Sequence, residues 1–274
     1  MDRRRVLVNF ASALGLSVVL VASAQAAGCP RDDALGTSRV IAVDAASSAR
    51  VGSKGFQALP LRDREVVLTF DDGPSPATDG KVLAALAEQC VRVTFFLIGK
   101  PASEYPDLVR QIAAAGHNIG HHTWSHPNLR VRKPDEAADE INKGIAAVEM
   151  AQNGVSTTTP STPFFRYPGF QMSQQTLDDL EKRRIVVFGA DVIADDWIPM
   201  TPEAQLKLLT DRLKAAGKGI ILLHDPQAQT AAVLPAFLRY LRDNGYSVVH
   251  VVPNEAARPV ADMDKAKNVN NSNN

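Results

Sequence analysis

The stretch 68-LTFDDGPSP-76 opens the regular part of the chain and marks the point where an apolar segment meets a polar one. The apolar run that begins at Val66 ends in two adjacent aspartates, Asp71 and Asp72, and the turn residues Gly73-Pro74 follow. Adjacent carboxylates repel each other, and neither has a partner in the local sequence. The pair therefore predicts either a polar turn or a site that holds something cationic.

From Glu65 onward, short apolar runs alternate with segments that have the apolar spacing of helices. This alternation predicts βαβ units and a parallel sheet. Continuous apolar runs such as 220-IILL-223 suit a sheet that is covered on both faces. The expected strands lie at 66–70, 93–99, 118–120, 163–166, 185–191, 219–225 and 246–252, and the expected helices at roughly 76–89, 101–115, 134–152, 173–183, 202–216 and 230–244.

Two architectures fit this order of elements, an open doubly wound sheet and a closed barrel. About seven strands fall within residues 63–253, which is fewer than the usual eight-stranded barrel contains. No G-x-G-x-x-G motif follows the first strand, which argues against a dinucleotide-binding fold. The pattern predicts a single α/β domain over residues 63–253 and is compatible with both architectures.

The N-terminus has the layout of a secretory signal peptide over residues 1–26. Arg3-Arg4-Arg5 precedes an apolar segment that ends at Val21, and 24-AQA-26 supplies the small residues of a cleavage site. We expect export to the periplasm or the extracellular space, and no transmembrane span in the mature chain, because the apolar segment is short. An uncleaved N-terminal anchor and a twin-arginine export signal are the alternatives.

The charge and cysteine content of the chain limit which binding partners and covalent attachments we expect. Lys+Arg and Asp+Glu balance at 30 each among 274 residues, so no basic field favours nucleic acid. Cys29 and Cys90 are the two cysteines, and an oxidising compartment favours one disulfide between them. The alternative is a lipid anchor on Cys29, because 26-AAGC-29 resembles a lipobox.

Two further segments lie outside the predicted domain. Residues 27–62 carry scattered Gly and Ser with little periodicity, and we interpret them as an N-terminal extension that wraps the domain. Residues 254–274 end in 268-NVNNSNN-274, a composition that predicts a flexible C-terminal tail.

Polar residues follow several of the predicted strands at their carboxyl ends, where α/β folds place their active sites. We expect all of these strand ends to converge on one rim. The residues concerned are Asp71-Asp72, the segment 121-HHTWSHPNL-129, Arg166, the segment 195-DDW-197, and His224-Asp225.

Three of the six histidines, His121, His122 and His126, fall within six consecutive residues. Imidazole and carboxylate are the usual ligands of zinc and of similar divalent metals. Two histidines four residues apart, together with one aspartate, would leave a coordination position open for water, as catalytic zinc sites do. The spacing predicts a metal site, and ordinary surface histidines are the alternative.

The other rim residues each have two interpretations. For His224 we favour a role in proton transfer over a structural role, because Asp225 is adjacent in sequence and both residues are expected on the same rim as the other candidates. Arg166 is expected to pair with a carboxylate and hold it ionised, rather than lie on the surface as an ordinary cation. The segment 195-DDW-197 suits either a sugar-binding rim or a solvated turn.

Together these motifs resemble those of the polysaccharide deacetylases, the carbohydrate esterases that include the chitooligosaccharide deacetylases. The resemblance covers about residues 63–253 and implies a distorted seven-stranded (β/α) barrel. The motifs occur in the family's order and are 69-TFDDG-73, 122-HTWSHP-127, 166-RYPG-169, 196-DW-197 and 222-LLH-224.

The resemblance implies a role for each motif residue. Asp71 would be the catalytic base, oriented by Arg166, and His224 the general acid, tuned by Asp196. The implied ligands of a divalent metal, most often zinc with cobalt or nickel as alternatives, are Asp72, His122 and His126. The implied substrate contacts are Gly169, Trp197, Leu222 and Tyr167.

Two positions depart from the family pattern. Gly169 stands where the third motif usually has Tyr, so a side-chain wall is lost, while the backbone N–H can still donate to an oxyanion. Ile193 stands where the fourth motif usually has a second Asp. These departures affect the expected substrate more than the expected chemistry.

The predicted function is metal-dependent removal of N-acetyl groups from an exported glycan of the cell wall, such as peptidoglycan or a chitin-like polymer. One alternative is O-deacetylation of an acetylated exopolysaccharide. Another is a metal-free barrel glycosidase that uses paired carboxylates such as Asp71 and Asp196. A non-catalytic glycan-binding protein is the third, and the chemically competent residue at every motif position argues against it.

Overall fold

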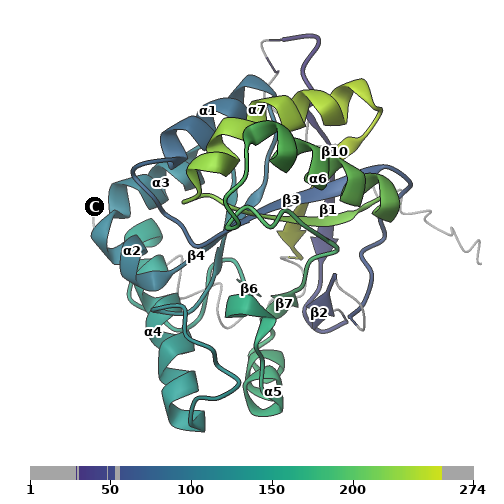
Figure 1. The fold of residues 1–274 in the computed structure, drawn as a ribbon. Helices are drawn as coiled ribbons and strands as arrows, with labels where there is room; N and C mark the ends of the chain where they lie inside the picture. The colour runs from purple at the N-terminus through teal and green to yellow at the C-terminus, as the bar shows by residue number, and fades with distance from the viewer. Residues whose placement is uncertain (1–28, 30, 48, 53–55, 255–274) are drawn as a thin grey trace, which may run out of the picture.

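The computed structural model of the chain describes residue 29 and residues 31–47, 49–52 and 56–254. Strands alternate with helices along this part of the chain, and Figure 1 shows the helices on the outside of the strands. Among these residues no helix is both long enough and apolar enough to cross a membrane. The signal peptide predicted at 1–26 and nearly all of the tail predicted at 254–274 lie outside the described residues.

The elements follow the predicted order with few exceptions. The strands are β1 (Thr37–Val43), β2 (Arg50–Val51), β3 (Glu65–Asp71), β4 (Thr94–Leu97), β5 (Asn118–His121), β6 (Phe164–Phe165), β7 (Val186–Phe188), β8 (Val192–Ile193), β9 (Gly219–His224) and β10 (Ser247–Pro253). The helices are α1 (Asp79–Glu88), α2 (Gly99–Glu104), α3 (Pro106–Ala114), α4 (Pro134–Asn153), the short 3-10 helix η1 (Pro168–Phe170), α5 (Gln174–Lys182), α6 (Pro202–Ala216) and α7 (Ala228–Asp243).

The strands pair in parallel and form the arrangement of a distorted (β/α) barrel. β3 pairs with β9 on one side and with β4 on the other, and the sheet continues through β5, β6 and β7. The chain then passes directly to β8, which pairs with β9 and so leads back to β3. The short barrel implied by the family resemblance, rather than an open sheet, is therefore the architecture.

The seventh barrel strand is not the expected one. The run at 246–252 forms β10, which pairs with β1 and with the first residues of β3, outside the series β3–β9. The seventh strand is instead β8, two residues within a stretch whose carboxylates indicated only a loop or rim. Its two residues lie in 191-DVIADDW-197, with carboxylates close on both sides, so no separate apolar run revealed it.

The predicted extension at 27–62 contains two strands that the sequence analysis missed. β1 pairs along its length with β10, and β2 pairs with β7. Burial alternates along the whole of β1, but its first three residues are polar, so apolar residues mark the strand only at its end. This segment is therefore part of the sheet as well as a covering.

The helix expected at 101–115 is two helices. α2 ends at Glu104 and α3 begins at Pro106, with Tyr105 as the cap between them. Proline fits the first turn of a helix, but it has no N–H and its ring collides with the preceding turn. The proline therefore ends one helix and starts the next.

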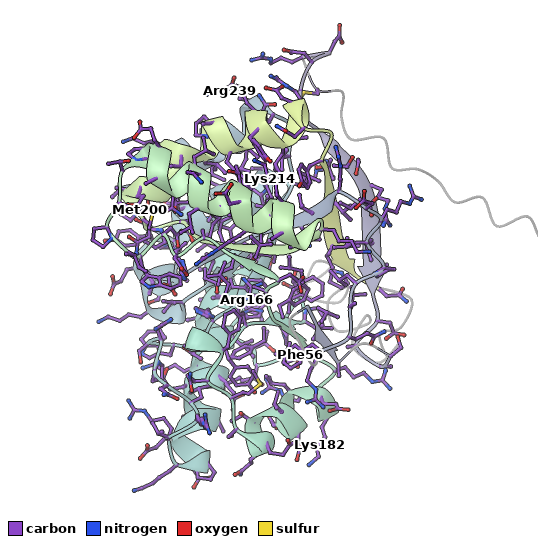
Figure 2. All side chains as sticks on the ribbon, turned by 45° about the vertical axis from the view of Figure 1, so that its right-hand side comes forward. Phe56, Arg166, Lys182, Met200, Lys214 and Arg239 are labelled. Carbon is purple, nitrogen blue, oxygen red and sulfur yellow. A yellow bond between two sulfur atoms is a disulfide. The ribbon has the colours of Figure 1, made fainter. Side chains whose placement is uncertain are left out.

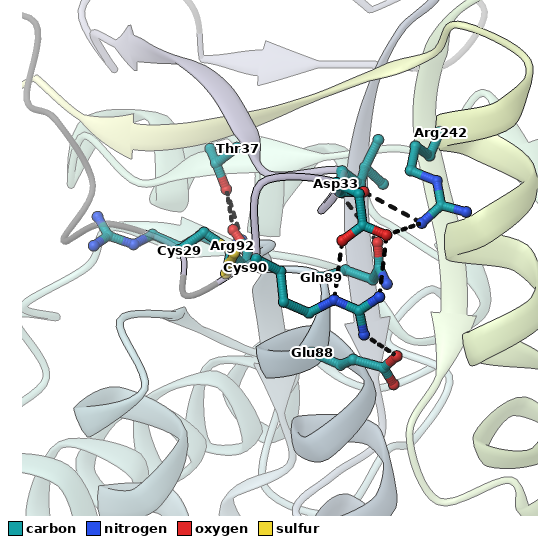
Figure 3. Close-up of a disulfide and its surroundings, with 10 residues drawn as sticks. Cys29, Asp33, Thr37, Glu88, Gln89, Cys90, Arg92 and Arg242 are labelled. Atoms are coloured by element: carbon teal, nitrogen blue, oxygen red, sulfur yellow. Dashed lines mark hydrogen bonds and ion pairs between the residues drawn. A yellow bond between two sulfur atoms is a disulfide. The ribbon is translucent and has the colours of Figure 1, made fainter.

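A disulfide joins Cys29 to Cys90, which are 61 positions apart, as the sequence predicted. Figure 3 shows the bond beside the end of α1, where Arg31 also donates a hydrogen bond of 3.0 Å to Glu88. The bond attaches the start of the described chain to the domain. A sulfur held in a disulfide cannot carry a lipid, so the structure favours the disulfide over the lipid anchor.

Alternation along β3 carries polar side chains into the barrel. Val66, Leu68 and Phe70 belong to one buried apolar cluster, whereas Val67 belongs to another that includes Phe96, Phe188 and Ile220. Successive residues of a strand point to opposite faces. Thr69 and Asp71 therefore share the face of Val67, and at the carboxyl end of the strand that face is polar.

Candidate active site

The candidate site lies at the carboxyl ends of the barrel strands. Strand register pairs Asp71 with His224 across β3 and β9, and His121 with Phe165 across β5 and β6. Asp71 and His224 therefore end neighbouring strands, and His122 and Arg166 follow the ends of the other two. The structure brings these residues of the predicted rim together, although they are far apart in sequence.

Asp72, His122 and His126 direct one ligand atom each toward a common point. These atoms all lie within 4.8 Å of one another, and the Nε2 atoms of both histidines lie 3.3 Å from Oδ1 of Asp72. Asp72 and His126 have positive φ angles of 78° and 60°. Non-glycine residues adopt this conformation at a cost of about 1–3 kcal/mol, so the surrounding fold must hold both loops in place.

The donor set fits a divalent metal. Nδ1 of His122 lies 2.7 Å from the carbonyl oxygen of Arg166, so Nδ1 carries the hydrogen and donates it. Nε2 is then an acceptor, and it faces Oδ1 of Asp72, a buried oxygen that has no hydrogen-bond donor. Two acceptors at this distance need a cation between them, and two imidazoles with one carboxylate are ligands of the kind that zinc takes.

The electrostatics keep these side chains in the forms that bind metal. Burial opposes the ionisation of Asp72, but its interactions with His122, His126 and His224 lower the pKa of Asp72 to about 2. Burial, aided by the charge of His122, lowers the pKa of His126. A metal ligand must be deprotonated, and at neutral pH Asp72 and His126 both are.

Asp71 has a separate partner, the fully buried Arg166 (Figure 2). One guanidinium nitrogen of Arg166 donates to Oδ1 of Asp71 at 2.7 Å and to Oγ1 of Thr69 at 2.8 Å, and the other donates to the carbonyl of Gly189 at 2.8 Å. The guanidinium also lies over the ring of Phe96, 4.4 Å from its centroid. Burial lowers the pKa of Arg166 and the charge of Asp71 opposes that shift. The arginine therefore fixes the direction of the Asp71 carboxylate.

His224 is held by Asp196 from the β8–α6 loop. Its Nδ1 lies 2.7 Å from Oδ1 of Asp196, and its backbone N–H donates to Oδ2 at 2.7 Å. The hydroxyl of Thr230 donates to the same Oδ2 at 2.5 Å. Burial of His224 disfavours its protonation, but the hydrogen bond and charge of Asp196, with the charges of Asp71 and Asp72, raise the pKa of His224. The imidazole is thus arranged to carry a proton on the Nε2 side.

The residues predicted to contact substrate are placed differently from one another. The ring of Trp197 is half-exposed and meets the ring of His224 edge-on at 5.3 Å. Gly169 is exposed with a φ of 54°, and Leu222 is buried in β9. Tyr167 packs into an apolar cluster with its ring 4.9 Å from Phe165, so its side chain belongs to the core.

His121 and Asp225, both of the predicted rim, lie apart from the cluster, and Asp195 bonds Arg212 instead. His121 is fully buried, with Nε2 3.7 Å from Glu149 of α4 rather than beside Asp72. Asp225, which the sequence placed beside His224, packs against Gly73 instead. The carboxylate that bonds the His224 ring is that of Asp196, which is 28 positions away in sequence.

Two threonines of the site had no role in the sequence analysis. Thr69 accepts a hydrogen bond from Arg166 and donates one of 2.7 Å to the carbonyl of Ile221. Thr230 lies in the first turn of α7 and bonds Asp196 across 34 positions of sequence. Thr69 lies inside the first motif and could have been suspected, whereas no local pattern marks Thr230.

Comparison with known proteins gives consistent results. Residues 58–187 match the family model described as polysaccharide deacetylase. The chitooligosaccharide deacetylase of Azorhizobium caulinodans is 30% identical over 197 residues, which are 67% of this chain and 90% of that protein. The peptidoglycan-N-acetylmuramic acid deacetylase PdaC of Bacillus subtilis is 31% identical over 188 residues, 68% of this chain.

The solved structure of the Bdellovibrio bacteriovorus peptidoglycan deacetylase Bd3279 superposes with a TM-score of 0.71 at 30% identity, and the match covers 82% of this chain and 61% of that one. The chain spans only 38% of the length of PdaC. The motifs, the barrel and these similarities agree, and the chain belongs to the polysaccharide deacetylase family.

Proposed function

We propose that the chain removes N-acetyl groups from an N-acetylhexosamine-containing glycan, either peptidoglycan or a chitin-like polymer, in a metal-dependent reaction. The observation that carries this proposal is the arrangement around Asp72, His122 and His126. A carboxylate held by Arg166 lies beside that cluster, and so does an imidazole held by Asp196. The names of the relatives, which act on peptidoglycan or chitooligosaccharides, support this substrate class.

The proposed metal ligands are Asp72, His122 and His126, with zinc as the most suitable ion and cobalt or nickel as substitutes. When bound, the metal supplies Lewis-acid activation of the amide carbonyl and of water. Nδ1 of His122 donates to the carbonyl of Arg166, which holds the ring with Nε2 directed at the site.

Asp71 is the proposed general base. Arg166, which also bonds Thr69, holds its Oδ1 side, and its Oδ2 lies 3.8 Å from Nε2 of His122, so the free oxygen faces the metal position. In the proposed reaction, Asp71 takes a proton from the water that adds to the acetyl carbonyl carbon. The backbone N–H of Gly169 would donate to the oxyanion that this addition creates.

His224 is the proposed general acid. Its Nε2 lies 4.0 Å from Oδ2 of Asp72, on the side of the ring away from Asp196. It would give its proton to the amine nitrogen as the carbon–nitrogen bond breaks, so that acetate and a free amine are released. Trp197 and Leu222 would flank the acetyl group, whereas a contact from Tyr167 would have to come from its backbone, because the side chain is buried.

We further infer that residues 63–253 are the catalytic domain and that the protein acts outside the cytoplasm after residues 1–26 are removed. The disulfide between Cys29 and Cys90 supports an oxidising compartment. Mass spectrometry of the secreted or periplasmic protein tests this, with Ala27 expected at the N-terminus. A recovered chain that still begins at residue 1 would contradict it.

The deciding experiment measures acetate release from peptidoglycan, chitooligosaccharides and an O-acetylated exopolysaccharide, with zinc-loaded protein and with protein treated with a strong chelator. We expect acetate from an N-acetylated glycan with the zinc-loaded protein alone. Acetate from the O-acetylated glycan only would favour the esterase alternative. New reducing ends formed equally well after chelation would favour the glycosidase.

A further inference from the structure

A second pair of aspartates lies beneath the candidate site. Asp79 opens α1 and Asp225 directly follows β9, and the side chains of both are fully buried. We call Asp79 and Asp225 the buried pair. Three of its four carboxyl oxygens, Oδ1 of Asp79 and both oxygens of Asp225, have no hydrogen-bond donor among the described groups. The fourth accepts a hydrogen bond of 2.9 Å from the N–H of Ser75.

Each carboxyl group of the buried pair shifts the pKa of the other, which brings the two groups within reach of one hydrogen bond. Two ionised carboxylates are acceptors only, so a hydrogen bond between them requires a proton on one of them. Burial, followed by the charge of Asp79, raises the pKa of Asp225 well above its ordinary value, and burial raises the pKa of Asp79. The proton is therefore retained where an exposed aspartate would have lost it.

Among the described residues, none of the main interactions that shift the pKa values of the buried pair is with a cationic side chain. Asp72, on the loop above, is negative and raises the pKa of Asp225 further. His224 precedes Asp225, but its ring is bonded to Asp196. The first turn of α7, 228-AQTA-231, contains no titratable side chain. Without an opposite charge beside them, a proton shared between the two carboxyl groups is what allows both to be buried.

The buried pair contacts the loop that carries the metal-ligand aspartate. The backbone N–H of Asp225 donates to the carbonyl of Asp71 at 3.3 Å, and a Cβ on Gly73 would lie 1.9 Å from Oδ2 of Asp225. The carboxyl group of Asp225 thus fills the space that a side chain at position 73 would need. At the other end of the loop, Asp79 exchanges two hydrogen bonds with the backbone of Ser75.

We propose that Asp79 and Asp225 share one proton, and that this carboxyl–carboxylate hydrogen bond positions the 71–75 loop against the end of β9. The bond joins the two elements that carry Asp72 and His224, so both members of the pair are positioning residues. The shared proton rests on the burial of both side chains, on their oxygens without a donor and on their raised pKa values, and not on the proposed function. Its consequence for metal binding rests on the proposed function.

The first test is thermal unfolding of the chelated protein between pH 5 and pH 9, for the wild type and for Asp225→Asn. An asparagine keeps the shape and offers an N–H in place of the shared proton. A raised pKa in the folded state means that the stabilisation is complete below the pKa of the unfolded chain and is lost as pH rises toward the folded pKa. The Tm of the wild type relative to the variant should therefore fall by about 3–5 °C per pH unit within that window.

Asp139→Asn is the matched control, because Asp139 is exposed on α4. Its Tm should follow that of the wild type at every pH. A constant Tm difference between the wild type and Asp225→Asn across the whole range would overturn the shared proton. This measurement uses neither metal nor substrate, so its result is independent of whether the deacetylase function is correct.

The second test measures zinc binding by titration calorimetry. Asp225→Ala removes the contacts to the loop and should weaken zinc binding by about 10–100-fold, as the loss of groups that orient metal ligands does. Asp225→Asn should bind zinc as the wild type does at pH 7. Equal loss in both variants would show that the negative charge, rather than the shared hydrogen bond, is what the loop needs. Unchanged zinc binding in Asp225→Ala would remove the positioning role.

Discussion

Four carboxyl groups lie close together in two different surroundings. Two form the rim pair, Asp71 and Asp72, and two form the buried pair, Asp79 and Asp225. Each member of the rim pair has a basic partner of its own, Arg166 for Asp71 and the two histidines for Asp72. The members of the buried pair have each other. The comparison teaches that the partner of a carboxyl group, more than its burial, decides its charge state.

Burial does not distinguish the two pairs, because Asp71 is 2% exposed and thus almost as buried as Asp225 at 0%. A carboxylate in such a place is stabilised by an opposite charge and by hydrogen bonds, and without them it takes up a proton. The rim pair can therefore serve as base and ligand. The buried pair lacks that compensation and is suited to a structural role.

The largest expected effect comes from removing a metal ligand of the rim. His126→Ala should abolish zinc binding and reduce deacetylase activity to the level of the chelated wild type. The His126 side chain is 42% exposed, so the substitution leaves no buried cavity and should not unfold the domain. Zinc content by atomic absorption and acetate release measure the effect. A variant that still bound zinc stoichiometrically would remove His126 from the ligand set.

Asp71→Asn tests whether the two members of the rim pair have different roles. The amide keeps the shape but cannot take a proton, so turnover should fall by about 10²–10⁴-fold. Zinc affinity should stay close to that of the wild type, because Asp72 and not Asp71 is the proposed ligand. The measurements are steady-state kinetics and zinc titration. Near-normal turnover would show that Asp71 is not the base.

The pH dependence of activity tests the other proposed proton carrier. His224 must be protonated to act as an acid, so activity should fall as pH rises through its raised pKa. Asp196→Asn removes the carboxylate that raises this pKa, and the alkaline limb of the profile should move to lower pH by about one unit.

Asp195→Asn is the control for that experiment, because Asp195 bonds Arg212 and not His224. Its alkaline limb should coincide with that of the wild type. If Asp196→Asn also left the limb in place, the group that titrates there would be something other than His224.

The smallest expected effect on activity comes from the disulfide, which lies at the far end of α1 from the buried pair. The double variant Cys29→Ser, Cys90→Ser should unfold more easily by about 2–4 kcal/mol, because the reduced chain has more freedom when unfolded. Its turnover per folded molecule should equal that of the wild type. Chemical denaturation and kinetics at a low temperature measure the two quantities. A loss of zinc binding would show that the bond also shapes the site.

Much of the fold could be predicted from local patterns in the sequence. The apolar runs that became β3, β4 and β9 are continuous and end in marked residues, so their position and parallel arrangement could be predicted. β8 and β2 could not, because their two residues lie beside charged or glycine residues and form no distinct apolar run of the kind that marked the equally short β6. These short strands are held by pairing with longer neighbours, which is a tertiary effect.

The candidate site divides in the same way. Asp72, His122 and His126 lie in two compact motifs, so the spacing of side chains already indicated a metal site. Thr230 lies 34 positions from Asp196, and only the packing of α7 brings it there. The sequence also placed Asp225 beside His224, but the end of β9 directs the two side chains to opposite neighbours.

By itself, the sequence determined the α/β class, the order of the elements and the chemical groups at the strand ends, because periodicity and residue type are local properties. Only the tertiary structure decided which carboxyl group meets which partner. Arg166 reaches Asp71, Asp196 reaches His224, and Asp225 meets Asp79, because parallel strands bring distant residues to one rim. The charge of a buried carboxyl group depends on those neighbours, so the contrast between the two aspartate pairs arises only when the barrel is formed.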